Sequence, residues 1–155
     1  MPFDSRCVVL ALLTLSTACG FRAAPLTGAR LEASLERCID DNWKFVGGQS
    51  ASGGSTSASS FYDWKFDVES APAEGDGVPA VAQTMAKFRA DLIALLEGQG
   101  CNVHGRGLSG LPEAPVGFHL EYTLPAEEGV VWCYSVPSEP DKTTILIVWH
   151  SAATR

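Results

Sequence analysis

The sequence predicts an α+β fold: an antiparallel sheet of four to six strands covered by one long amphipathic helix, with an additional N-terminal helix. Three observations lead to this prediction. Apolar residues recur with a helical period at 29–41 and again at 79–97, and alternating apolar and polar residues fill most of 118–150. Because the last strands follow one another without intervening helices, we expect them to pair antiparallel.

Both helices are predicted from periodicity. In the first, over residues 29–41, apolar side chains recur three or four residues apart with acidic side chains between them. The second begins after Pro79, which suits a first helical turn, and stops at Gly98 and Gly100. Burial of its apolar face would contribute on the order of 10 kcal/mol before entropy is counted. That face consists of Val81, Met85, Phe88, Leu92, Leu95 and Leu96.

The segment between the two helices predicts two strands with a long loop between them. Residues 43–46 are short and β-prone, and residues 61–69 alternate as a half-buried strand does. Residues 47–60 are almost wholly Gly, Ser, Thr, Ala and Gln, a composition typical of flexible coil. We therefore expect a mobile loop over 47–60, and a further loop over 70–79.

The C-terminal third predicts an antiparallel meander. Residues 101–107 form a weak strand, and residues 108–117 form a loop rich in Pro and Gly. Alternation predicts strands at 118–124 and 130–136, and the apolar run at 143–150 is typical of a more fully buried strand. Since all four tryptophans fall in predicted strands, we expect them in the core. They are Trp43, Trp64, Trp132 and Trp149.

Composition limits the chain to one small acidic domain. Its 155 residues carry a net charge of −7, with 46% hydrophobic and 19% charged residues, which is typical of a folded protein with a single core. The acidic surface repels phosphate backbones, so no nucleic-acid partner is expected. We predict one domain over 28–155, and no cofactor.

The first 18 residues have the pattern of a signal peptide. Residues 7–15 are an apolar run far shorter than the roughly 20 residues that span a bilayer. Small residues follow, and then Cys19. The string Leu-Ser-Thr-Ala-Cys over 15–19 resembles the lipobox of bacterial lipoprotein precursors. Ordinary secretion stays an alternative, since the same small residues suit a non-lipoprotein signal peptidase cutting at the same bond.

The lipobox resemblance implies a location. Cys19 would become the lipidated N-terminus, with residues 19–27 as lipidated cysteine and tether, and the membrane would be bound through that lipid. Gly20 after the cysteine is similar to the outer-membrane sorting choice of Gram-negative lipoproteins, which implies an outer membrane facing the periplasm. The alternative is a free periplasmic or secreted protein.

Three cysteines remain once the leader and Cys19 are set aside: Cys38, Cys101 and Cys133. An oxidising compartment favours a disulfide between two of them, and the sequence does not select the pair. The alternative is that all three are small buried apolar residues.

One constellation could carry chemistry. His119 and Glu121 share a strand face, and His150 on a neighbouring strand could complete a zinc or copper site. Cys133 with His119 one strand away is the one thiol and imidazole pair that could form a nucleophile. The chain has no nucleophile elbow, phosphate loop or dinucleotide fingerprint.

From residue 61 onward, the predicted order of strand, helix and four strands resembles the cystatin-like arrangement, in which a curled sheet holds a helix. Residues 101–105 lack the Gln of the cystatin inhibitory motif, so protease inhibition is not implied. The leading hypothesis is an exported, lipid-anchored, non-enzymatic domain whose sheet or Gly/Ser loop binds another envelope protein or a cell-wall component. The rival is a small envelope metal-binding protein or enzyme that uses His119, Glu121 and His150.

Overall fold

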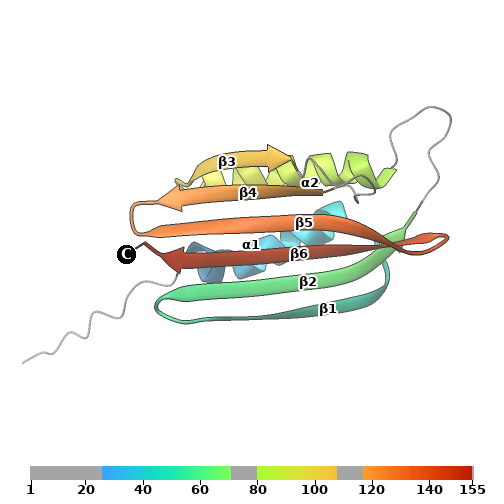
Figure 1. Ribbon diagram of the computed structural model, residues 1–155, viewed down its shortest axis with the longest axis horizontal. Coiled ribbons are helices and arrows are strands. Elements are labelled where there is room, and N and C mark those ends of the chain that lie inside the picture. The colour runs from blue at the N-terminus through green and yellow to red at the C-terminus, as the bar shows by residue number, and fades with distance from the viewer. Residues whose placement is uncertain (1–25, 71–79, 108–116, 155) are drawn as a thin grey trace, which may run out of the picture.

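The computed structural model describes residues 26–70, 80–107 and 117–154 of the chain. In these residues a helix, two strands, a second helix and four strands follow one another (Figure 1). This order matches the sequence prediction. The elements are α1 Thr27–Asn42, β1 Phe45–Ser55, β2 Ser59–Glu69, α2 Ala80–Glu97, β3 Asn102–Gly107, β4 Gly117–Leu124, β5 Glu127–Glu139 and β6 Lys142–Ala153.

The six strands form one antiparallel sheet in the order β1-β2-β6-β5-β4-β3, and β3 to β6 are the predicted meander. Both helices lie on the same face of this sheet (Figure 1). Helix α1 contacts β2 and β6, α2 contacts β3 and β4, and the helices contact each other. The α+β class is confirmed.

We expected one long helix to cover the sheet, but α1 and α2 cover it together. The sheet is too wide for a single helix. A helix with its side chains is about 10–12 Å across, whereas six strands about 4.8 Å apart span roughly 24 Å. A single helix would therefore leave half of the inner face of the sheet open.

The core lies between the helices and this inner face. On α1 the large buried side chains are four residues apart, at Leu31, Leu35 and Ile39. Helix α2 ends at Glu97, and Gly100 follows with a φ of 80°, so the predicted glycine stop is confirmed. The buried side chains of α2 belong to the predicted face, and they are Met85, Phe88, Leu92 and Leu96.

The prediction of a mobile loop over residues 47–60 is wrong, because most of these residues belong to β1 and β2. β1 runs to Ser55 and pairs with β2 from Phe45 onward, so only residues 56–58 lie between the two strands. The small residues suit a strand beside bulky neighbours, because a methyl group on Gly53 would fall on the ring of Tyr62. Backbone pairing with β2 stabilises β1 without help from large side chains.

Strand β5 presents its aromatic residues to the side opposite the helices. Val131 and Cys133 are fully buried on the inner face, whereas Trp132 between them is 40% exposed. Neighbouring residues of a strand point to opposite faces, so the alternation at 130–136 belongs to the outer face. The expectation that all four tryptophans lie in the core is therefore wrong for Trp132 and confirmed for the other three.

The domain begins before residue 28. Leu26 is 6% exposed and Thr27 is 1% exposed, so the last two residues assigned to the tether belong to the folded domain. The leader 1–18, Cys19 and all but one residue of each predicted loop, 70–79 and 108–117, lie outside the described residues. Of the second loop, Gly117 belongs to β4. Within the described part, neither helix is long and apolar enough to cross a membrane.

Candidate functional site

The residues of the predicted metal site do not come together. His119 and Glu121 share the outer face of β4, with His119 Nε2 3.6 Å from Glu121 Oε1. His150 is two strands away on β6, and Val130 on β5 lies between it and Glu121 in the register. Two strand spacings are about 10 Å. In the part of the chain that the structure describes, no three His, Cys, Asp or Glu side chains are close enough to hold a metal ion.

The three cysteines are free thiols, and none of the expected disulfides is present between them. Cys133 is fully buried with its Sγ 3.1 Å from Sδ of Met85 on α2, while Cys38 is half-buried on α1. Burial and the nearby Asp91 carboxylate raise the pKa of Cys38 to about 11. Thiols with a raised pKa are poor nucleophiles at neutral pH.

A nucleophile built from Cys133 and His119 is contradicted by the register. Cys133 pairs with Phe118 and faces the helices, whereas His119 pairs with Trp132 on the opposite face. Burial also raises the pKa of Cys133. The sheet itself therefore separates the thiol from the imidazole.

The first candidate site is the outer face of the sheet, which neither helix covers (Figure 1). Trp132 lies between His119 on β4 and Val148 on β6, and in the next row Tyr134 lies beside Leu146. We call the apolar residues of this face the outer strip. The outer strip consists of Val130, Trp132, Tyr134 and Val136 on β5, and Leu146 and Val148 on β6.

Carboxylates flank the outer strip on both sides. Asp63 and Asp67 lie on β2 next to β6, with Lys65 between them, and Glu121 lies on β4 next to β5. Phe61 on β2 extends the apolar surface and is 46% exposed. An apolar centre with polar surroundings is typical of a protein interaction surface.

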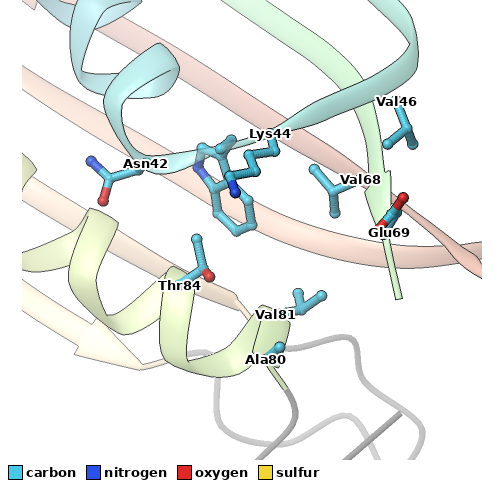
Figure 2. A pocket seen from close by; sticks show the side chains of 9 residues that line it. Asn42, Lys44, Val46, Val68, Glu69, Ala80, Val81 and Thr84 are labelled. Carbon is cyan, nitrogen blue, oxygen red and sulfur yellow. The ribbon is translucent and has the colours of Figure 1, made fainter. Parts of the chain in front are cut away.

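The second candidate site is a cavity of about 570 Å³ between the end of α1 and the start of α2. Figure 2 shows Asn42 and Lys44 on one side, Val46, Val68 and Glu69 on the other, and the first turns of α2 below them. Its volume falls in the range of small-molecule sites. The lining residues are Asn42, Trp43, Lys44, Val46, Val68, Glu69, Ala80, Val81 and Thr84.

Contacts behind the cavity hold its walls in place. The Trp43 ring packs at 6.0 Å against Phe66 and at 6.0 Å against Phe88. Asn42 donates a hydrogen bond of 2.9 Å to Asp91 of α2 and accepts one of 2.8 Å from Lys87. The hydrogen bonds from Lys87 and Asn42 lower the pKa of Asp91. The amide of Asn42 is therefore already engaged and acts as a brace between the helices.

The sequence hypothesis named the sheet as a binding surface but did not locate the outer strip, and it missed the cavity. For the outer strip, a signal was present: residues 145–149 on β6 are apolar without interruption, a pattern typical of strands covered on both faces. For the cavity no local signal exists, because its walls come from three separate segments of the chain, 42–46, 68–69 and 80–84.

Comparison with known proteins adds no family. No protein-family model matches the chain, and no curated protein sequence matches it. Among solved structures, the human StarD13 (DLC2) lipid transfer and protein localization domain is 12% identical, with 81% of this chain and 83% of that chain covered and a TM-score of 0.19. A TM-score of this size does not show a common fold.

Proposed function

We propose that this chain is an exported, lipid-anchored protein of the cell envelope whose domain is non-enzymatic and binds another envelope protein through the outer strip. The observation that supports the binding role is Trp132, a large aromatic side chain that is 40% exposed on a sheet face without a helix. Tryptophan is enriched where interfaces have their largest binding energies.

The anchoring part of the proposal rests on the lipobox-like string ending at Cys19. Leu26 is already buried in the domain, so only residues 20–25 separate it from the lipidated cysteine. Six residues extend at most about 20 Å. The domain would thus stay close to the membrane surface, and a partner would have to reach it there.

The chemistry of the outer strip favours a polypeptide partner with basic residues. Its centre combines aliphatic and aromatic side chains, as protein interfaces do, and carboxylates outnumber the lysine beside it on β2. A second copy of the chain would bring carboxylates against carboxylates, which costs free energy. A basic partner would instead pair with Asp63, Asp67 and Glu121.

The experiment places a photo-crosslinking amino acid on the outer strip of the full-length chain in the cells that produce it. We expect adducts from position Tyr134 and none from the matched control Glu36, which is exposed on α1. The intact mass of the same purified material should begin at Cys19 and include acyl chains. Absence of adducts at both positions would contradict the binding role, and an unmodified Cys19 would contradict the anchor.

A further inference from the structure

We propose that the part of the partner that covers the outer strip is one amphipathic α-helix with basic residues on both sides of its apolar face. This inference rests on the function proposed above and specifies the partner of the same surface. Four properties of the outer strip support it: its position within the sheet, its width, its length and the charges beside it.

The strands of the outer strip have no free backbone edge. β6 pairs with β2 and β5, and β5 pairs with β4 and β6, so a partner on this face meets side chains alone. A single extended segment laid there would bury its own backbone N–H and C=O groups without hydrogen-bond partners, which costs free energy. An α-helix makes these hydrogen bonds within itself. A helix therefore covers the outer strip at a lower cost than a lone strand.

The outer strip is as wide as one helix. Its residues lie on two adjacent strands, and polar side chains lie on either side in the same row, with Asp63 beside Val148 and His119 beside Trp132. Two strands occupy about 10 Å of a sheet, and a helix with its side chains is about 10–12 Å across. The inner face has the same proportion, since α1 contacts β2 and β6 while α2 contacts β3 and β4. One further helix therefore fits the outer strip.

The length of the outer strip also suits a helix. On β5 it extends from Val130 to Val136, which is about 20 Å of strand and the length of a helix of about 13 residues. Trp132 is 40% exposed and Val136 is 39% exposed. A helix along β5 and β6 would remove the apolar surface of both side chains from water, which favours binding.

Carboxylates on both sides of the outer strip favour a basic partner. Asp63 and Asp67 lie on β2 with Lys65 between them, and Glu121 lies on β4 at the other side. Neither aspartate forms an ion pair within the described part of the chain. Lysine or arginine on each flank of a helix would pair with these carboxylates, whereas anionic lipid headgroups would be repelled. The charges therefore favour a basic helix over a membrane surface.

Fluorescent peptides of about 14 residues test the helical form of the partner. Two contain Leu and Lys in equal numbers, one with Leu at helical spacing and the other with Leu and Lys in alternation. The protein is the full chain with Cys19→Ser, which cannot be lipidated. Anisotropy at about 0.15 M salt measures both affinities while distant charges are screened. We expect the helical peptide to bind at least about tenfold more tightly than the alternating one, and a helical peptide with Glu in place of Lys not to bind.

Matched variants locate the peptide on the outer strip. Trp132→Ala should lower the affinity for the helical peptide about tenfold or more, and Val46→Ala should leave it unchanged, because Val46 is 42% exposed but lies outside the strip. Asp67→Asn should weaken binding and Lys65→Gln should strengthen it, each by about two- to fivefold. Glu36→Gln, on α1, should have no effect.

The outcomes distinguish a wrong helix from a wrong binding surface. No binding of the helical peptide, no preference for it over the alternating one, or equal effects of Trp132→Ala and Val46→Ala would each overturn the helix. Crosslinks from Tyr134 in cells would then still support the proposed function, whereas absence of both crosslinks and peptide binding would overturn both. A dimer of the unlipidated chain that Trp132→Ala dissociates in sedimentation would also overturn the helix, since a second copy would then cover the strip.

Discussion

A buried carboxylate joins the start of the domain to its sheet. Glu127 is 4% exposed; its Oε2 accepts a hydrogen bond of 2.7 Å from the backbone N–H of Thr27, and its Oε1 accepts one of 2.9 Å from Tyr122. Trp149 Nε1 in turn lies 3.2 Å from the Tyr122 hydroxyl. No side chain of α1 caps its own N-terminus, so Glu127 supplies the acceptor and the negative charge that a helix start favours.

We expect Glu127→Ala to destabilise the domain by about 2–4 kcal/mol, because two buried donors lose their acceptor at once. Glu128→Ala is the matched control, since Glu128 is the next residue and is exposed; its effect should stay within about 0.5 kcal/mol. Guanidinium unfolding of both variants measures the difference. Equal midpoints would show that the carboxylate does not hold α1 to the sheet.

At the scale of elements, the sequence predicted the helices and strands whose side chains pack in the core. Both helices and the strands of the meander have an apolar face with a clear period, and all are present. For β1 the sequence predicted only a short strand over 43–46, because ten of the eleven residues of β1 are exposed and show no alternation of buried and exposed side chains. Its pairing comes from backbone hydrogen bonds with β2, which composition does not reveal.

Gly53 and Gly54 test why β1 is built from small residues. A methyl group at Gly53 would fall on the Tyr62 ring and the Phe61 carbonyl, whereas at Gly54 nothing lies within 4 Å. Gly53→Ala should destabilise by about 1–3 kcal/mol through this overlap. Gly54→Ala should be neutral or stabilise by up to about 1 kcal/mol, since the unfolded chain loses freedom. Thermal unfolding of the two variants compares them directly, and equal shifts would contradict the packing argument.

The candidate sites were harder to predict than the elements. His119 and Glu121 do share a face, as their spacing predicts, but the place of His150 depends on β5 lying between β4 and β6. Strand order is a long-range property, and alternation along one strand carries no information about it. The same holds for the cavity, whose walls meet only after α1, β1, β2 and α2 have packed.

At the scale of the whole molecule, the helices cover one face of a two-faced sheet. The inner face carries fully buried residues such as Ile145 and Trp149, while the outer strip carries apolar residues that remain half-buried or exposed. Stability therefore comes from the inner layer, and neither helix covers the outer strip. The acidic side chains beside the strip disfavour self-association through this apolar surface.

The buried thiols and Tyr122 give this inner layer a dependence on alkaline pH. Burial raises the pKa of Cys38 to about 11 from 9.0, and it raises the pKa values of Cys101, Cys133 and Tyr122 as well. Above the ordinary pKa the unfolded chain releases these protons while the folded chain retains them, so the unfolded state binds fewer protons and stability falls as pH rises.

We therefore expect the free energy of unfolding to be constant up to about pH 8 and to decrease above about pH 9. Cys133→Ala should be less stable at pH 7, because it leaves a small cavity beside Met85, but its decrease above pH 9 should be shallower. Urea unfolding at several pH values measures both slopes under reducing conditions. A decrease of the same steepness in both proteins would show that the Cys133 proton is not held by the fold, and would place the thiol outside the sealed layer between β5 and α2.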